Sequence, residues 1–253
     1  MKILFVTPPP YLPNRLHRNR SFDLIRILAI KHEVHLLSVT TYKEEPKEFR
    51  EIKKVCKSVS IIYLSPWRAW LNCVLFPLLP AEVAYCYSEK AIEEIQKIIQ
   101  RKNIDIAYLK RLRSAIYLGN DKKYVNIPVI LDTTDAMSMF YFRMYKQASF
   151  PRKLFYFLEA IRYKQYEKIS AKRIKNWIVC SEVDKKYLEN GVILSGTQDN
   201  RKFVIRVVPN PVDTDYFSLR YFSRPPRGSP FGHPQGAYLR DNSLLFRGLM
   251  DKP

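Results

Sequence analysis

The stretch that decides the fold is residues 1–39, "MKILFVTPPPYLPNRLHRNRSFDLIRILAIKHEVHLLSV". The apolar run Lys2–Thr7 predicts a first strand, and the run Glu33–Val39 predicts a second one. Between them, apolar residues recur at helical spacing, at Phe22, Ile25, Leu28 and Ala29. Because both runs are continuous rather than alternating, they suit strands that are buried on both faces of a parallel sheet.

The alternation of strand-like and helical segments continues to about residue 210. Five more strands are predicted, over Ser58–Leu64, Asp105–Leu109, Pro128–Asp132, Asn176–Ser181 and Phe203–Val208. A helix that Ser88 caps precedes the second of these. We therefore predict an α/β fold over residues 1–217, a Rossmann-like doubly wound parallel sheet with flanking helices.

The composition changes after residue 217. Residues 218–242 contain four prolines and three of the seven glycines, so we expect a linker or an irregular loop there. Residues 243–253, "SLLFRGLMDKP", start with a strand-like run that has no neighbour to pair with. We expect them to be the start of a second domain that this chain, truncated at that point, does not contain.

The charge favours polyanionic partners. The chain has 43 Lys and Arg against 24 Asp and Glu, a formal net charge of +19. Nucleic acid, an anionic membrane surface and phosphorylated substrates all fit this balance. The four cysteines lack metal-ligand spacing and indicate reduced thiols, and the first apolar run ends at Thr7 without forming a secretory signal. We expect a cytoplasmic protein.

Two stretches leave alternatives open. Ala69–Ala81, "AWLNCVLFPLLPA", is too short and too interrupted to cross a bilayer, and it is either a core helix or an apolar surface element that touches lipid. Phe140–Lys175 has ten Lys and Arg interleaved with ten Phe and Tyr. It is either a long amphipathic helix with an aromatic core face or a segment that contacts an anionic membrane or nucleic acid. No nucleic-acid-binding motif accompanies it.

Candidate site residues follow the predicted strands, because ligands of open parallel sheets bind beyond the carboxyl ends of the strands. These residues are Asp132, Asp135, Ser138 and Ser181. The two aspartates could form a metal pair or an acid–base couple, or one of them could cap the next helix. Farther along, Asn210 lies between two prolines and could simply form a tight turn.

The turn after the first strand has prolines and arginines but no glycine. Arg15, Arg18 and Arg20 lie near a helix start, where cations are disfavoured, so they either contact an anion or are solvated. A Walker loop and a GxGxxG motif are both absent from the sequence, which argues against a nicotinamide dehydrogenase. The spacing of His32 and His35 does not predict a metal site.

Several segments together resemble the N-terminal half of a GT-B glycosyltransferase of the retaining family 4. They are the opening strand, turn and Arg-rich helix, then "ILDTTDAMSMFYFRMYKQ", "LFYFLEAIRYKQYEKISAKRIKNWIVCSEVDKKYL" and "IRVVPNPVDTDYF". The likeness is strongest to sugar transferases associated with exosortase and exopolysaccharide clusters. It extends in order over nearly the whole chain, and "SLLFRGLMD" is similar to the first strand of that family's second domain.

The resemblance implies that this domain binds the acceptor. In such enzymes the second domain binds the nucleotide-sugar through a Glu-x7-Glu signature, and transfer needs no metal. We expect this chain to end before that signature, so that it contains no cofactor, no metal site and no complete catalytic site. Acceptor-binding candidates are Arg15, Asp132, Asp135, Ser138 and Ser181, and the interdomain crossover would involve Asn210 and Asp213. Pro211 stands where the family has glycine, which restricts the backbone of that crossover.

These observations lead to two function classes. The first is the acceptor-binding half of a retaining hexosyltransferase, inactive alone, which takes a lipid-linked or polysaccharide acceptor. Its basic charge would hold it as a peripheral protein on the inner face of an anionic membrane, and the exposed cleft wall could form a dimer. The second is a non-catalytic α/β module that binds a phosphorylated ligand or RNA.

Overall fold

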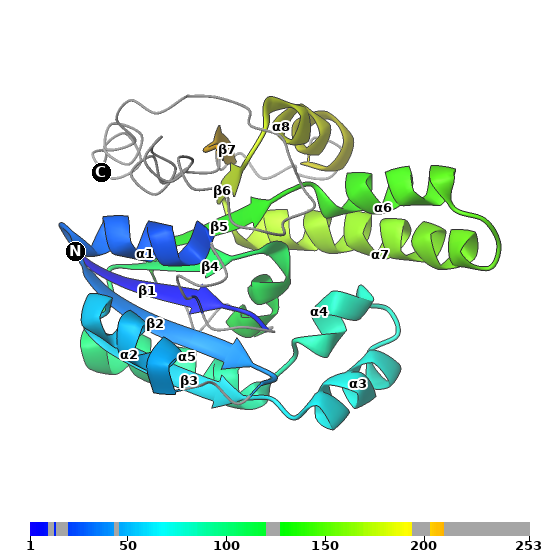
Figure 1. Cartoon of the computed structure of the whole chain (residues 1–253). Helices are drawn as coiled ribbons and strands as arrows, with labels where there is room; N and C mark the ends of the chain where they lie inside the picture. Colours follow the sequence, from blue (N-terminus) through cyan, green and yellow to red (C-terminus); the bar gives the residue numbers. More distant parts are fainter. Residues whose placement is uncertain (10–12, 14–19, 43–45, 120–126, 194–202, 210–253) are drawn as a thin grey trace, which may run out of the picture. The chain divides into compact units, whose positions relative to one another are not determined.

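The computed structural model describes residues 1–9, 13, 20–42, 46–119, 127–193 and 203–209 (Figure 1). By its contacts the chain divides into two compact units, Met1–Val207 and Val208–Pro253. All the described helices and strands belong to the first unit, and only two residues of the second unit are described.

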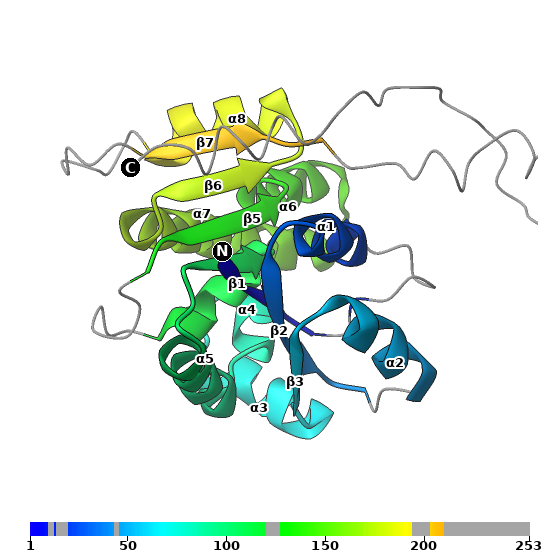
Figure 2. The same cartoon turned by 90° about the vertical axis from the view of Figure 1, so that its left-hand side faces the viewer.

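The described residues form one sheet of seven parallel strands in the order β3-β2-β1-β4-β5-β6-β7 (Figure 2). The strands are β1 (Lys2–Thr7), β2 (Glu33–Thr40), β3 (Ser58–Tyr63), β4 (Ile106–Lys110), β5 (Val129–Thr134), β6 (Asn176–Val179) and β7 (Val204–Val207). Each lies within two residues of a predicted strand. The predicted fold class is therefore confirmed.

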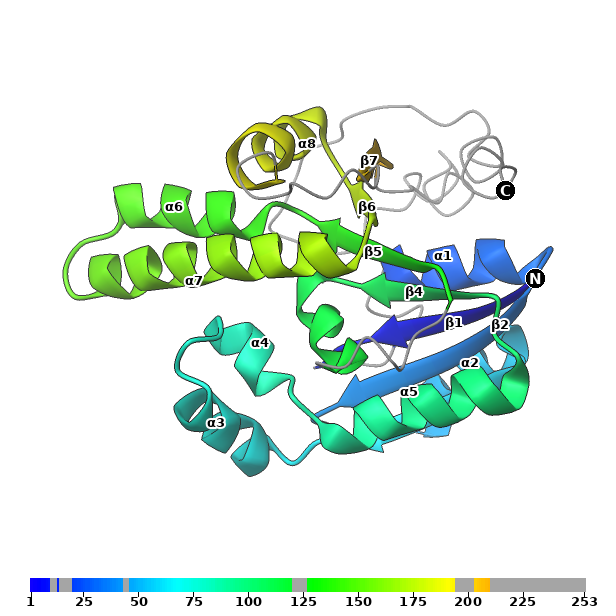
Figure 3. The ribbon, with the colours of Figure 1, turned by 180° about the vertical axis from the view of Figure 1, so that it is seen from behind.

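Helices cover both faces of this sheet. They are α1 (Arg20–Ala29), α2 (Pro46–Val55), α3 (Pro66–Leu75), α4 (Ala81–Tyr85), α5 (Glu89–Lys102), α6 (Met137–Gln147), α7 (Arg152–Arg173) and α8 (Glu182–Leu188), with the 3₁₀ helix η1 (Leu112–Leu118) and a π turn at Glu189–Ile193. Helices α1 and α2 lie on one face, and α5 and α7 lie on the other (Figures 1 and 3). The strand order reverses between β1 and β4, because the helices that follow β1 and β2 lie on one face of the sheet and the helix that precedes β4 lies on the other. Ligands of such sheets bind at the carboxyl edge beside the point of reversal, so the crevice is expected there.

The core lies on both sides of the central strands. Strands β1, β2 and β4 are buried along almost their whole length, as their continuous apolar runs predict. Trp177 of β6 is among the largest fully buried side chains, and its indole Nε1 donates to the Ile174 carbonyl at 2.9 Å. This hydrogen bond satisfies the polar atom of the ring at no cost to its packing.

The basic stretch Phe140–Lys175 is not one long helix. It forms most of the hairpin of α6 and α7, which projects beyond the carboxyl ends of the strands (Figure 3). The rings of Tyr141 and Tyr163 stack between the two helices, with centroids 5.1 Å apart, so part of the predicted aromatic core face exists. Among the described residues, no helix is long and apolar enough to cross a membrane.

The cap of α5 gives a test of the local structure. The Ser88 side chain accepts a hydrogen bond from the Ala91 amide at 3.3 Å, whereas Ser65 precedes α3 without a side-chain cap. We expect Ser88→Ala to lower the free energy of unfolding by about 1 kcal/mol. The matched change Ser65→Ala should have an effect below about 0.5 kcal/mol. Urea unfolding of both variants checks this; equal losses would contradict the cap assignment.

Candidate functional site

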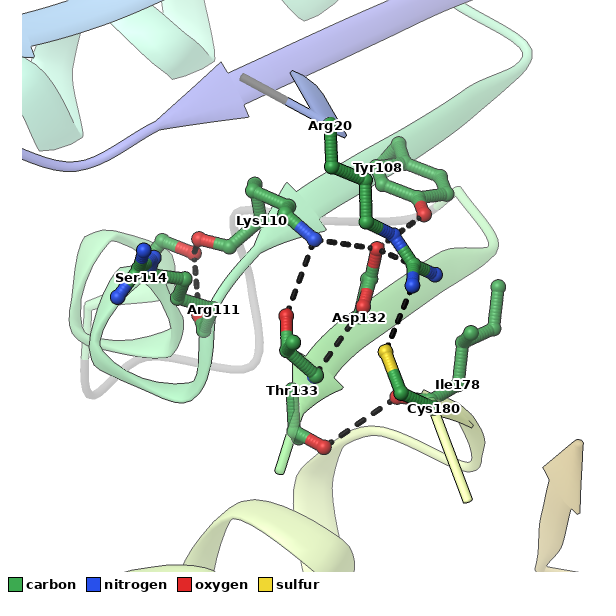
Figure 4. A network of polar contacts seen from close by, with 10 residues as sticks. Arg20, Tyr108, Lys110, Arg111, Ser114, Asp132, Thr133, Ile178 and Cys180 are labelled. Atoms are coloured by element: carbon green, nitrogen blue, oxygen red, sulfur yellow. Dashed lines mark hydrogen bonds and ion pairs between the residues drawn. The ribbon is translucent and has the colours of Figure 1, made fainter. Parts of the chain in front are cut away.

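A buried carboxylate organises the carboxyl edge of the sheet. Asp132, the fourth residue of β5, is 0% exposed. Its Oδ2 accepts hydrogen bonds from the Tyr108 hydroxyl at 2.6 Å and from the Lys110 ammonium at 2.8 Å. The Arg20 guanidinium lies 3.5 Å from the same oxygen. Figure 4 shows the three side chains converging on Asp132 from β4 and α1.

The charges in this cluster stabilise one another. Burial alone would raise the pKa of Asp132, but Lys110 and Arg20, with the hydrogen bonds from Lys110 and Tyr108, hold it below its ordinary value. Burial lowers the pKa of Lys110, and Asp132 opposes that shift. Arg20 also donates to the Cys180 sulfur at 2.6 Å, so the cluster joins α1 to the end of β6. Asp132 is therefore a structural centre rather than a group that a ligand reaches.

Two residues next to the cluster have unusual backbone geometry. Arg111, directly after β4, has φ 66°, and Thr134, at the end of β5, has φ 69°. Such angles are costly for residues with a side chain, above all for a β-branched one. The Arg111 amide donates to the Asp132 carbonyl at 2.6 Å, and the Thr134 hydroxyl accepts from Lys110 at 3.0 Å. The buried cluster thus holds both turns in place.

A pocket opens above these two turns. Its lining residues are Glu82, Arg111, Leu112, Arg113, Thr133, Thr134, Asp135, Met137 and Tyr163. Arg113 forms an ion pair with Glu82 at 2.9 Å and donates to the Pro9 carbonyl at 2.9 Å. Tyr141 donates to the other oxygen of Glu82 at 3.1 Å. These contacts fix the wall that α4 and η1 contribute.

Arg111 and Asp135 are the polar side chains that this arrangement leaves open. Both are exposed at the pocket, and within the described part of the chain neither side chain has a hydrogen-bond or ion-pair partner. Burial and the nearby Asp184 raise the pKa of Asp135, while Arg111 opposes the rise. One guanidinium and one carboxylate on a rigid floor can together bind a ligand that has both hydrogen-bond donors and acceptors.

The structure separates the predicted site residues. Of the four that it describes, only Asp135 lines the pocket. Ser138 is 1% exposed, and its hydroxyl donates to Glu167 at 2.5 Å. Ser181 caps α8, because its side chain accepts from the Asp184 amide at 3.1 Å. Arg15, Asn210 and Asp213 lie outside the described residues, so their roles stay predictions.

The alternative that Asp132 or Asp135 caps the following helix is wrong. Ala136 occupies the N-cap of α6 and makes no side-chain cap. The amides at this helix start are satisfied from distant elements instead: Ala136 donates to Asp184 at 2.9 Å, and Ser138 donates to Glu167 at 3.1 Å. Side chains from α7 and α8 thereby anchor the helix that begins beside the pocket.

A Glu-x7-Glu spacing does occur, contrary to the expectation that the chain ends before one. Glu159 and Glu167 both belong to α7 and are 0% and 1% exposed. Glu159 accepts from the Ala81 amide at 2.9 Å and pairs with Arg162 at 2.8 Å. Because both carboxylates are buried and hydrogen-bonded within the domain, neither is open to a sugar or a diphosphate. The spacing is a structural coincidence here.

The cations at the end of β4 were not among the predicted site residues. Lys110, Arg111 and Arg113 occur together in "LKRLR", Leu109–Arg113, directly at a predicted carboxyl end. The rule that selected Asp132 and Asp135 also applies to this stretch. Glu82 carried no comparable signal, because only the packing of α4 brings it to the pocket.

The chain is similar to solved glycosyltransferases. UGT2 of Phytolacca americana, complexed with UDP-2fluoro-glucose and pterostilbene, is 16% identical over 89% of this chain and 57% of its own, with a TM-score of 0.53. Sucrose-phosphate synthase of Thermosynechococcus elongatus is 12% identical over 88% and 53%, with a TM-score of 0.51. UGT71G1 of Medicago truncatula, complexed with UDP-glucose, is 12% identical over 82% and 51%, with a TM-score of 0.50.

These likenesses define the class of fold: a Rossmann-like α/β domain of the GT-B glycosyltransferase type. The chain spans about half the length of each of these three structures. No protein-family model matches the sequence, and no curated protein matches it either.

Substitution of the two aspartates tests whether Asp132 stabilises the fold and Asp135 does not. We expect Asp132→Asn to lower the free energy of unfolding by about 3 kcal/mol, because it leaves the buried Lys110 ammonium without its anion. Asp135→Asn, three residues away and exposed, should change it by less than about 0.5 kcal/mol. Urea unfolding at neutral pH measures both. A larger loss for Asp135→Asn than for Asp132→Asn would contradict the assignment.

We expect the buried carboxyl of Glu167 to make the stability of the protein depend on pH. Burial raises its pKa from the ordinary value of 4.5 to about 7, although the hydrogen bonds from Ser138 and Met137 oppose the rise. The folded protein therefore holds the proton more tightly than the unfolded chain does, and the free energy of unfolding falls as pH rises between these two values. We expect Glu167→Gln to remove this fall, which is of the order of 3 kcal/mol.

Denaturant unfolding between pH 4.5 and 8 checks this prediction. The control Glu182→Gln, at an exposed position of α8, should keep the pH dependence of the wild type. If Glu167→Gln shows the same slope as the wild type, the buried Glu167 carboxyl is not its source.

Proposed function

We propose that this chain is the acceptor-binding half of a retaining glycosyltransferase that works on the cytoplasmic side of the membrane. The enzyme would transfer a sugar from a nucleotide-sugar to a lipid-linked or polysaccharide acceptor, as in exopolysaccharide synthesis. The observation that carries the proposal is the pocket at the carboxyl edge, where Arg111 and Asp135 are open above a floor fixed by buried charge. The GT-B type of the fold supports the same class of reaction.

The chemistry of the pocket suits a sugar acceptor. Sugar hydroxyls donate and accept hydrogen bonds, so a carboxylate and a guanidinium side by side can each bind one. Met137, which is partly exposed, adds apolar surface against which a sugar ring can pack, whereas Leu112 and Tyr163 are only 2% and 1% exposed. A ligand held there would lie at the edge where parallel α/β sheets bind their ligands.

The donor would require a second domain. By the resemblance, the nucleotide-sugar belongs to the C-terminal domain, and the buried Glu159 and Glu167 do not replace its signature. We expect these 253 residues alone to release no sugar from UDP-glucose above the rate in buffer. A coupled assay for UDP measures this; clear turnover that Arg111→Ala abolishes would contradict the proposal that the chain is only half of the site.

Titration of the chain with acceptor-type ligands tests the proposal. The probes are a set of mono- and disaccharides, a polyprenyl-phosphate-linked sugar, and UDP-glucose. We expect acceptor sugars to shift the amide NMR signals of Arg111 and Asp135 and UDP-glucose to leave them unchanged. Arg111→Ala and Asp135→Asn should each weaken binding about tenfold, since each removes a hydrogen bond to or from a charged group.

The control is Arg26→Ala, on α1 and outside the residues that line the pocket. Equal binding by the control and by Arg111→Ala would place the sugar elsewhere. UDP-glucose shifting the pocket signals would assign the pocket to the donor and overturn the proposal.

A second function, a module that binds a phosphorylated ligand, has one specific observation in its favour. At the opposite edge of the sheet a second pocket is lined by Lys2, His35, Lys57, Arg101 and Lys102, together with Glu33, Ser58 and Asn103. His35 is 4% exposed, its Nδ1 lies 2.7 Å from the Ser58 hydroxyl, and its Nε2 has no partner within the described residues. Titration with inorganic phosphate distinguishes the two functions: shifts at His35 and none with sugars would favour the module.

A further inference from the structure

The large apolar side chains of helix α3 point outward instead of into the core. The buried face consists of small or polar residues, with Ala69 at 0% and Asn72 at 6% exposed. The outward face carries Trp67, Trp70, Leu71, Val74 and Leu75, and Leu78 continues it past the helix end; these six are 44–85% exposed. The residues recur at helical spacing, so they form a stripe along α3 rather than scattered exposures.

Contacts hold α3 in this orientation. Asn72 donates to the Tyr87 carbonyl at 2.9 Å, and the Trp70 ring meets the Tyr85 ring edge-on at 5.7 Å. The Cys73 thiol also donates to the Ala81 carbonyl at 3.5 Å. Because a polar residue of α3 is satisfied on the inner side, rotating the helix to bury its tryptophans would leave that side-chain amide without its hydrogen bond.

The α6–α7 hairpin exposes a second apolar surface at the same end of the domain. Phe140, Phe142, Phe150, Leu154, Phe155 and Leu158 are 42–80% exposed. The α3–α4 pair and the hairpin both lie beyond the carboxyl ends of the strands (Figures 1 and 3). They touch through α4, where Glu159 of α7 accepts from the Ala81 amide and Tyr141 of α6 donates to Glu82.

The charges around this surface are almost all positive. Residues 137–158 contain Arg143, Lys146, Arg152 and Lys153 and no acidic residue. The acidic residues of the whole stretch 137–175 are Glu159 and Glu167, and both are buried. Residues 64–81 contain Arg68 and no acidic residue, and the next residue, Glu82, is paired with Arg113 at 2.9 Å. An anionic surface therefore meets no repulsion from these segments.

Two lysines of the α6–α7 hairpin lie over aromatic rings. The Lys146 ammonium lies 5.1 Å from the centroid of the Phe142 ring, and the Lys153 ammonium lies 5.3 Å from that of Tyr145. Long basic side chains that cover aromatic surface and keep the charge outward suit the boundary between headgroups and acyl chains. The core of a protein interface is instead depleted in lysine.

We propose that the outward face of α3 and the exposed end of the α6–α7 hairpin dock this domain on an anionic lipid bilayer. The tryptophans and phenylalanines enter the headgroup region, and the surrounding lysines and arginines bind anionic headgroups. The docking surface is distinct from the pocket, and its test involves no sugar. Glu82 and Tyr163, which line the pocket, belong to α4 and α7 of the same end, so docking would also bring the pocket close to lipid-linked acceptors.

Vesicle binding by the 253-residue chain tests the proposal. Wild-type protein should sediment with phosphatidylcholine vesicles that contain phosphatidylglycerol and at least tenfold more weakly with phosphatidylcholine alone. Trp67→Ser/Trp70→Ser should weaken binding more than tenfold, because two large side chains no longer enter the interface. Arg152→Glu/Lys153→Glu should weaken it about thirtyfold or more.

The control Lys90→Glu/Lys97→Glu makes the same change in net charge on α5, away from the surface, and should bind within about threefold of the wild type. Equal loss in this control and in Arg152→Glu/Lys153→Glu would overturn the docking surface, since net charge alone would explain binding. Equal binding to both vesicle types would also overturn it.

Tryptophan fluorescence gives an independent readout. The chain has three tryptophans; Trp67 and Trp70 are exposed, and Trp177 is 1% exposed. Anionic vesicles should shift the emission to the blue, and brominated lipids should quench it, in the wild type but not in Trp67→Phe/Trp70→Phe. Emission unchanged by vesicles would contradict the proposal. So would a concentration-dependent dimer that Trp67→Ser/Trp70→Ser abolishes while vesicle binding is absent, because a second copy would then cover α3.

Discussion

The buried carboxylate of Asp132 is the constraint on which the rest of this edge of the sheet depends. A charge that is 0% exposed must be compensated locally, and Tyr108, Lys110 and Arg20 do so. The three partners come from β4 and α1, and Arg20 extends the cluster to Cys180 after β6. The ends of β4, β5 and β6 and the start of α1 are thereby fixed relative to one another. The positive φ angles of Arg111 and Thr134 persist because this cluster over-determines them.

The fold could be predicted from the sequence because a parallel sheet buries both faces of its strands. That requirement leaves continuous apolar runs, and the run Lys2–Thr7 matches β1 residue for residue. The site could be predicted only in part. The carboxyl-edge rule selected Asp135, which lines the pocket, but also Asp132 and Ser138, which lie three residues to either side of it and are buried. Tertiary contacts, such as the hydrogen bond from Ser138 to Glu167, decide which side chains after a strand face the pocket and which are buried. The spacing of residues along the sequence does not predict these contacts.

The polar pocket and the apolar end of the domain are built by the same elements, the α3–α4 pair and the α6–α7 hairpin. Helix α4 contributes Glu82 to the pocket and holds α3, whose outward stripe is apolar. Helix α7 contributes Tyr163 to the pocket and carries the exposed phenylalanines near its start. A minimal doubly wound domain needs neither the α3–α4 pair nor so long a hairpin. Both lie at the carboxyl edge, so under the proposed function and the proposed lipid docking an acceptor in the pocket would be held beside a bilayer.

Native-state hydrogen exchange measures most directly whether buried charge fixes the floor of the pocket. The amides of Arg111, Ala136 and Ser138 donate to groups of Asp132, Asp184 and Glu167 at 2.6, 2.9 and 3.1 Å. We expect these three amides to exchange only through global unfolding, with the same opening free energy as Phe5 in the centre of the sheet. Exchange of the three amides at the rate of exposed loop residues, while Phe5 stays protected, would show that the floor opens on its own and would contradict a preformed site.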